Sequence, residues 1–168
     1  RNLGGEKRDY IRGFGYQGGG GREGWGRDIA EMNVGGAFKD ALTEPGTWQM
    51  GIGGFGETLP YHENKVTLDK NKKDKWGLPV LHLEMEYGEN EKQMRDDMKR
   101  CAKEMLETAG PVWSAEIDDP SVPGNTIHEM GTARMGNDPK TSVLNKFNQC
   151  HDAPNVFVTD GACMVSSA

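Results

Sequence analysis

Residues 127–136 read IHEMGTARMG, and residues 156–162 read VFVTDGA. The first stretch places His128 among glycine, threonine and methionine residues. The second is typical of a short buried strand that ends in Asp160 and Gly161. Together the two stretches indicate a histidine base that is held against a cofactor lying over the end of a strand.

The two stretches resemble the C-terminal signature of the glucose-methanol-choline (GMC) family of flavoprotein oxidoreductases. In that family the histidine faces the flavin, and the strand ending in Asp-Gly passes along the cofactor. The resemblance therefore implies that His128 is the general base and that Asp160, Gly161 and Ala162 contact FAD. It also implies a fragment of a longer enzyme, because the family builds most of its FAD site upstream and places a second catalytic His or Asn further along. We expect this chain alone to be inactive.

The resemblance implies an α+β fold in which an antiparallel β-sheet is covered by helices and forms the substrate-binding domain. The last strand segment of the FAD-binding domain would follow it. We expect a glycine-rich irregular segment at 1–56, the substrate-binding sheet and helix at 57–127, and the catalytic histidine segment with the returning strand at 128–168.

Composition excludes several other classes of protein. The net charge is −6 and the basic residues are scattered among acids, so no basic stripe suits a nucleic acid. No apolar run has the length of a membrane span. No signal peptide is present, but one would lie in the expected upstream part of the enzyme, so bacterial cytoplasm and periplasm both stay open. Only 35% of the residues are hydrophobic and 24 are glycine, so the chain is expected to be marginally stable alone.

The cysteine and histidine spacings do not indicate a metal site. Three cysteines without a CxxC spacing favour buried thiols over disulfides or zinc, at the positions Cys101, Cys150 and Cys163. His62, His82 and His151 are interpreted as surface or sheet residues. A nucleophile built from residues 150–152 is disfavoured, because adjacent residues seldom face one another.

Two segments, 13–18 and 51–56, match the pattern GxGxxG. A dinucleotide site needs a hydrophobic strand before this pattern and a helix after it. Neither segment has both, so we interpret them as surface loops or glycine-kinked strands.

Periodicity predicts the regular elements. Strands are expected at 48–52, 65–68 and 112–116, and the alternation of Leu81, Leu83, Met85 and Tyr87 with polar residues predicts a half-buried strand. Residues 69–75 are predicted to be a hairpin loop, with a basic binding patch as the less favoured alternative. Residues 90–109 are predicted to be a helix that starts at an Asn90–Gln93 capping box and stops at Gly110. Its apolar face is interpreted as core packing, at the positions Met94, Met98, Cys101, Ala102, Met105, Leu106 and Ala109.

Each candidate site residue has a structural alternative. His128 could simply bond to backbone, and the Asp160–Gly161 pair could be a plain turn. Arg134 could bind a carboxylate, although pairing with Glu129 or Asp138 is favoured. An Asp-Pro turn is predicted at 138–139.

Two functions from different classes follow. In the first, the chain is the C-terminal part of an FAD-dependent oxidoreductase acting on a small alcohol, sugar or sugar acid. Its electrons would pass to a quinone, a cytochrome or O₂. In the second, it is a non-catalytic, β-rich carbohydrate-binding module that stacks sugars on Trp25, Trp48, Trp76 and Trp113. The resemblance favours the first.

Overall fold

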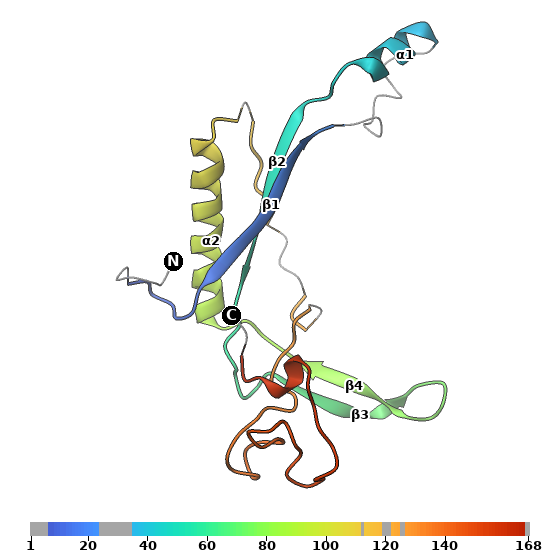
Figure 1. The fold of residues 1–168 in the computed structure, drawn as a ribbon, viewed down its shortest axis with the longest axis vertical. Coiled ribbons are helices and arrows are strands. Elements are labelled where there is room, and N and C mark those ends of the chain that lie inside the picture. Colours follow the sequence, from blue (N-terminus) through green and yellow to red (C-terminus); the bar gives the residue numbers. More distant parts are fainter. Residues whose placement is uncertain (1–6, 24–34, 112, 119–121, 125–126, 167–168) are drawn as a thin grey trace. The chain divides into compact units, whose positions relative to one another are not determined.

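A computed structural model describes residues 7–23, 35–111, 113–118, 122–124 and 127–166. Its regular elements, in chain order, are β1 (Phe14–Arg22), α1 (Gly36–Thr43), β2 (Trp48–Gly56), β3 (Lys65–Lys73), β4 (Pro79–Glu84), α2 (Glu89–Thr108) and a short 3-10 helix, η1 (Gly161–Cys163) (Figure 1). The strands form two separate two-stranded sheets, β1 with β2 and β3 with β4. Two-stranded sheets and two α-helices agree with the expected α+β class.

The chain divides into two units, residues 15–55 and a second unit made of residues 1–14 and 56–168. Except for Gly13, both GxGxxG segments lie in β1 and β2, so the alternative of glycine-containing strands holds for them. The expectation that residues 1–56 are irregular was wrong for these strands and for α1. Glycine permits the pairing, because a Cβ at Gly18 would collide with the backbone of Gly51 and Ile52.

In the second unit, β3 and β4 form an antiparallel hairpin that pairs Val66 with Leu83 and Leu68 with Leu81. β3 continues to Lys73, so the loop predicted at 69–75 was placed too early. The turn is built around Asp74, whose Oδ1 accepts the backbone N–H of Trp76 at 2.8 Å and that of Leu78 at 2.9 Å. One carboxylate oxygen therefore holds two backbone N–H groups of the turn.

The strand predicted at 81–87 was confirmed over residues 81–84, but its predicted half-burial was wrong. β4 ends at Glu84, and Leu81 and Leu83 are 64% and 46% exposed. Period-two alternation marks which side chains share a face, but a second layer is needed to bury that face. Among the described elements, β3 and β4 pack mainly against each other.

Helix α2 confirms the predicted helix, with Met94 and Cys101 each 1% exposed on its inner face. Met105 is 43% exposed, so the buried face of α2 includes fewer positions than the helical spacing of apolar residues predicted. Its first turn differs from the prediction. The carboxylate of Glu91, rather than an Asn90–Gln93 box, accepts the backbone N–H of Gly88 at 2.9 Å.

Glu91 also fixes the chain before the helix. Its carboxylate accepts the Leu59 N–H and the Tyr61 hydroxyl, each at 2.9 Å, although only 9% of the residue is exposed. Three donors satisfy the buried charge, which would otherwise be costly. Asn90 is used differently: its side chain accepts from the Ile11 N–H and donates to the Ile11 carbonyl. The segment before β1 is thereby tied to α2.

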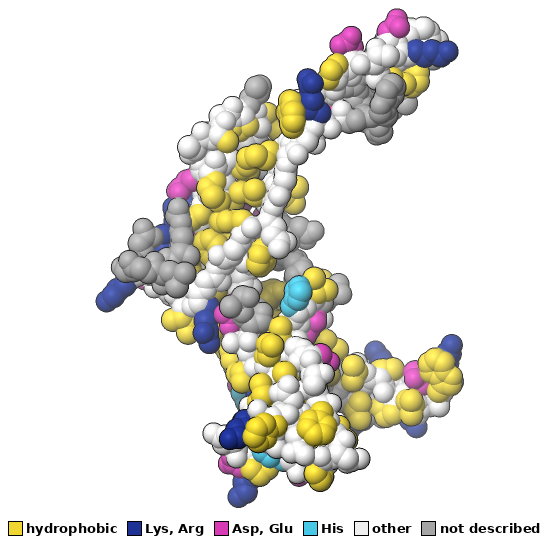
Figure 2. All heavy atoms as spheres, in the orientation of Figure 1, with side chains coloured by type: hydrophobic (Ala, Val, Ile, Leu, Met, Phe, Trp, Pro, Cys, Tyr) yellow, Lys and Arg dark blue, Asp and Glu magenta, His cyan; other side chains and the backbone are white. Residues whose placement is uncertain are grey.

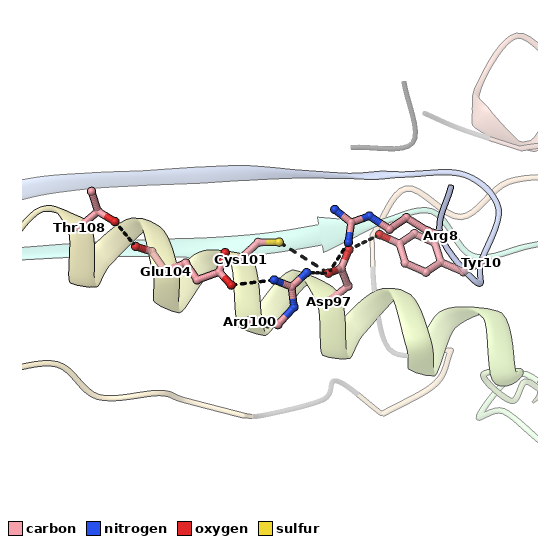
Figure 3. Close-up of polar contacts among 7 residues, drawn as sticks. All are labelled: Arg8, Tyr10, Asp97, Arg100, Cys101, Glu104 and Thr108. Atoms are coloured by element: carbon pink, nitrogen blue, oxygen red, sulfur yellow. Dashed lines mark hydrogen bonds and ion pairs between the residues drawn. The ribbon is translucent and has the colours of Figure 1, made fainter. Parts of the chain in front are cut away.

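A polar cluster around Asp97 strengthens this attachment (Figure 3). The Tyr10 hydroxyl donates to Asp97 Oδ2 at 2.6 Å, and Arg8 and Arg100 both pair with Oδ1. Burial and the hydrogen bond to Asp97 raise the pKa of the Tyr10 phenol well above its ordinary value. Burial opposes ionisation of Asp97, but the Tyr10 and Arg100 hydrogen bonds outweigh it and lower the pKa of that carboxyl. The pair is most stable with tyrosine protonated and aspartate charged.

Replacing Tyr10 with Phe should lower the free energy of unfolding at neutral pH by about 0.5–1.5 kcal/mol, because Asp97 loses a donor. A raised folded-state pKa for Tyr10 means that its contribution is complete below the unfolded pKa, which is about 10, and is lost at higher pH. Urea unfolding at pH 8 and above pH 10 should therefore show a smaller alkaline loss in Tyr10→Phe than in the parent. A Tyr16→Phe variant controls for removal of a phenol from the other unit. Equal alkaline losses in all three proteins would contradict the assignment.

Residues 127–166 contain little regular structure and are joined by isolated bridges. Leu144 bridges to Met135 and Cys150, and Gln149 bridges to Phe157. The expected buried strand at 156–158 is wrong, since it amounts to that single bridge and Phe157 is 57% exposed. The strand predicted at 112–116 is also absent from residues 113–116, and residue 112 lies outside the described residues. Residues 156–158 pair only with residues 148–150, where the Cys150 N–H donates to the Val156 carbonyl at 2.9 Å and the Val158 N–H donates to the Asn148 carbonyl at 3.0 Å.

Candidate functional site

His128 lies on an exposed bend with a backbone φ of +67°. Among the non-glycine residues that the structure describes, only two others have a positive φ, Arg12 and Asn148. This conformation costs a non-glycine residue about 1–2 kcal/mol, although histidine adopts it more readily than most. Residues with a strained backbone are enriched at functional sites. The bend therefore makes His128 a candidate functional residue.

Asp160 and Gly161 begin the short helix η1. The Asp160 carboxylate accepts the Ala162 N–H at 2.9 Å, and the Asp160 carbonyl accepts the Cys163 N–H at 3.2 Å. The aspartate therefore acts locally as a helix cap. Of the three predicted cofactor-binding residues, Asp160 is exposed, while Gly161 and Ala162 are half-buried.

The structure brings the two quoted stretches together. The Ala133 N–H donates to the Ala162 carbonyl at 3.0 Å, and the Met135 N–H donates to the Cys163 carbonyl at 2.9 Å. A Cβ at Gly131 would lie 3.6 Å from the Met164 carbonyl oxygen. The segment that follows His128 is thus joined to η1 by backbone contacts, although the segments are far apart in sequence.

Gly161 packs closely against the histidine segment. A Cβ built on it would lie 2.9 Å from Met130 Sδ and 3.1 Å from the Glu129 carbonyl oxygen. The space that glycine leaves is therefore filled by the histidine segment itself. Met130 was not singled out from the sequence, because a methionine between Glu and Gly carries no distinct signal.

These contacts test how well Asp160, Gly161 and Ala162 suit FAD. The Asp160 carboxylate and the Ala162 N–H already bond to each other, which leaves little for a cofactor. By contrast, no hydrogen bond within the described part of the chain uses the Gly161 backbone N–H. An oxygen-rich cofactor such as FAD needs donors of this kind. The Gly161 N–H is therefore the backbone donor that this segment would have available for such a cofactor.

Replacing Gly161 with Ala should destabilise the contact with the histidine segment by about 1–3 kcal/mol, because the new methyl group meets Met130 and the Glu129 carbonyl. Gly13 is the matched control, since a Cβ there meets nothing within 4 Å. Urea unfolding of both variants checks the difference. If Gly161→Ala had the same free energy of unfolding as the parent, the histidine segment would have moved aside without a loss of stability.

A second polar pair, His151 with Ser142, was not predicted from the sequence. His151 Nε2 lies 3.1 Å from Ser142 Oγ, whose hydroxyl donates to the Asp138 carbonyl at 2.7 Å. The serine proton is therefore engaged, and the histidine is the donor in the pair. No sequence signal indicated this contact, which is made by a turn. That turn confirms the prediction at 138–139: Asp138 Oδ1 accepts the Lys140 N–H at 2.9 Å.

Arg134 makes no ion pair with Glu129 or Asp138 in the described part of the chain, contrary to the favoured interpretation. Its side chain instead borders a shallow hollow, together with Lys140, Ser142, Cys150 and Asp152. The three cysteines are free thiols; Cys101 and Cys163 are buried as predicted, and Cys150 is half-buried.

The described residues include no group of three or more His, Cys, Asp or Glu side chains that could hold a metal ion. No helix in the described part of the chain has the length and apolarity to cross a membrane.

Comparison with known proteins establishes the family. Residues 60–168 match the family model described as GMC oxidoreductase. The chain is 40% identical over 114 residues to 2-methyl-1,2-propanediol dehydrogenase of Mycolicibacterium austroafricanum, an alignment that covers 67% of this chain and 20% of that protein. It is 31% identical over 134 residues to the gluconate 2-dehydrogenase flavoprotein of Pantoea cypripedii, covering 75% and 22%. It is 27% identical over 123 residues to pyranose 2-oxidase of Tricholoma matsutake, covering 66% and 21%.

This chain belongs to the GMC oxidoreductase family. The relatives are, by their names, dehydrogenases and oxidases of alcohols, sugars and a sugar acid. The chain spans about a fifth of the length of these relatives.

Proposed function

We propose that this chain forms the substrate-side part of an FAD-dependent oxidoreductase, in which His128 is the general base that removes the hydroxyl proton of an alcohol or sugar. The observation that carries the proposal is the backbone arrangement around His128. Its bend leads directly into residues 129–135, and the Ala133 and Met135 N–H groups bond to η1, so the His128 backbone and the Asp160–Ala162 segment belong to one local structure. Family membership supplies the reaction class.

Oxidation of a carbinol to a carbonyl removes a hydride from carbon and a proton from oxygen. A neutral imidazole accepts such a proton near neutral pH, and a positioned base of this type contributes about 10²- to 10⁴-fold in rate. The exposure of His128 leaves its ring accessible to a substrate hydroxyl. When bound, FAD supplies the acceptor for the hydride.

Within this proposal, the Asp160–Ala162 segment contacts FAD through the Gly161 N–H. The Asp160 carboxylate stabilises η1 as its N-terminal cap, because it accepts the Ala162 N–H. Met130 fills the space beside Gly161 and so holds the histidine segment at a constant distance from η1. We place the substrate-binding sheet and helix at 57–127 and the catalytic segment at 128–168, as parts of a longer protein that provides the rest of the FAD site.

The proposed substrates are small alcohols, sugars or sugar acids, the classes named for the relatives. The electron acceptor is proposed to be a quinone, a cytochrome or O₂.

The test is spectroscopic and uses a protein that carries this chain within a length comparable to that of the relatives. Flavin absorbance should be present, and one of a panel of polyols, sugars and sugar acids should bleach it without O₂. A well-folded, colourless protein that still binds sugar would overturn the proposal. Rapid re-oxidation by O₂ would distinguish an oxidase from a dehydrogenase.

A further inference from the structure

We propose that His151 is a positioning residue, which acts through Ser142 to fix the segment that joins His128 to η1. The observation behind the proposal is a chain of two hydrogen bonds. His151 Nε2 lies 3.1 Å from Ser142 Oγ, and that hydroxyl donates to the Asp138 carbonyl at 2.7 Å. The inference rests on the proposed function, because it concerns the placement of the same base and the same FAD contact.

Ser142 lies directly against the backbone of Gly136. A Cβ added at Gly136 would lie 2.6 Å from Ser142 Cβ and 2.8 Å from its Oγ, so the serine side chain occupies the space that glycine leaves. A serine side chain has three staggered rotamers, and the bonds to His151 and Asp138 hold Oγ in one of them. The imidazole therefore fixes the side chain that packs on Gly136.

Hydrogen bonds hold residues 133–136 on two sides. On one side, two N–H groups of this segment donate to carbonyls of η1 at 2.9 and 3.0 Å. On the other side, the Gly136 N–H donates to the Leu144 carbonyl at 2.8 Å, and the Arg134 carbonyl accepts two N–H groups from residues 143–144. The position of residues 142–144 therefore helps to set how the chain that begins at His128 meets η1.

His151 contacts residues 142–144 at two points. Its backbone N–H donates to the Val143 carbonyl at 3.0 Å, and its half-buried imidazole reaches Ser142. The backbone bond remains when the side chain is removed, so a substitution at position 151 tests the imidazole alone. Because the serine proton is given to Asp138, Nε2 of the imidazole is the donor. Glutamine carries a donor nitrogen at the same number of bonds from Cβ.

Surface chemistry does not mark this role. Figure 2 shows hydrophobic, acidic, basic and histidine side chains mixed over the visible face of the C-terminal segment that Figure 1 colours orange to red. The role follows instead from contacts whose partners are all supplied by residues 133–163. It is therefore argued without regard to which part of a longer protein covers that face.

A displaced base slows the reaction. A misplacement of about 1 Å caused far from the chemistry can lower a rate by about 10²-fold. His151 acts through one serine and a few backbone bonds, so His151→Ala should lower the limiting rate of flavin bleaching by about tenfold. The substrate concentration for half-maximal bleaching should change by less than about twofold, because the lost orientation matters in the transition state.

The experiment uses the flavin-loaded protein that contains this chain, with rates normalised to bound flavin. His151→Gln should retain most of the parental rate, because it keeps the donor to Ser142. Ser142→Ala should slow bleaching as His151→Ala does, and the double variant should be no slower than either single variant, since both remove one bond. Additive losses in the double variant would overturn the proposal, as would a His151→Gln protein as slow as His151→Ala.

Hydrogen exchange of the same proteins without substrate gives a readout that does not depend on turnover. The amides of Ala133 and Met135, which bond to η1, should exchange faster in His151→Ala and at the parental rate in His151→Gln. The amides of α2 should exchange at the parental rate in every variant, which separates a local displacement from unfolding. Faster exchange throughout the protein would make the histidine a purely structural residue and overturn the proposal.

Asp152→Ala is the matched control, because Asp152 is the next residue in the chain. Within the part of the chain that the structure describes, no hydrogen bond or ion pair uses its carboxylate. Its removal should change neither bleaching nor exchange, and effects equal to those of His151→Ala would overturn the proposal. A parent protein that carries flavin but is bleached by no substrate would overturn the proposed function and this inference with it. Parental bleaching in His151→Ala would overturn this inference alone.

Discussion

Replacing His128 with alanine should lower kcat by about 10²- to 10⁴-fold in the flavin-loaded protein that contains this chain. The reason is that the substrate hydroxyl would lose its proton to water rather than to a positioned imidazole. Stopped-flow measurement of flavin bleaching by a saturating substrate reports this step directly. Flavin content should be unchanged, because the proposed FAD contacts lie in the Asp160–Ala162 segment.

His82→Ala is the matched control for this experiment. His82 is a histidine on β4 whose Nε2 lies 3.5 Å from Glu84 Oε1, and its side chain is 53% exposed. Its removal should leave kcat unchanged. Added imidazole should restore part of the rate of the alanine variant, and the acidic limb of the pH–rate profile should change only in His128→Ala. A His128→Ala protein that bleaches at the parental rate would rule out the base.

Replacing Leu144 with alanine should lower the free energy of unfolding by about 2–5 kcal/mol. Leu144 is 0% exposed, the most deeply buried side chain among the described residues. Its backbone also accepts the Gly136 N–H at 2.8 Å and donates to the Arg134 carbonyl at 3.2 Å. A cavity at this position would therefore loosen the segment that connects His128 to η1.

Hydrogen exchange at the amides of Gly136 and Cys150 measures this effect locally, alongside denaturant unfolding. Val143→Ala is the matched control, because its side chain is 44% exposed and should cost much less. Leu144→Val should fall between the two, since it removes less volume. Equal exchange rates in the alanine variants at positions 143 and 144 would show that Leu144 does not organise this region.

The helix α2 could be predicted from sequence because its signals are local. Apolar residues at helical spacing and a terminal Gly110, whose φ is +73°, specify a helix wherever its partner lies. The Asp-Pro turn at 138–139 was likewise predicted, since the aspartate acts on its own neighbours. The start of α2 was predicted to within one residue, but the cap was assigned to Asn90 and Gln93 rather than to Glu91. The further bonds that Glu91 accepts from Leu59 and Tyr61, about 30 positions away, have no local signal.

The predictions of burial made from the sequence were wrong at two segments. Alternation at 81–87 and the apolar residues at 156–158 predicted buried strands, but Leu81 and Phe157 are more than half exposed. Periodicity reports which residues share a face and carries no information about what covers it.

The sequence alone determined the family resemblance and helix α2, and it made His128 the candidate base, because these rest on local patterns of residue type. Only the tertiary structure decided what those residues touch. It placed Gly161 against Met130, engaged Asp160 as a cap, and joined Tyr10 to Asp97 across 87 positions. Such contacts depend on how distant backbone segments approach one another, and that approach is set by packing and hydrogen-bond satisfaction over the folded unit rather than by neighbouring residues.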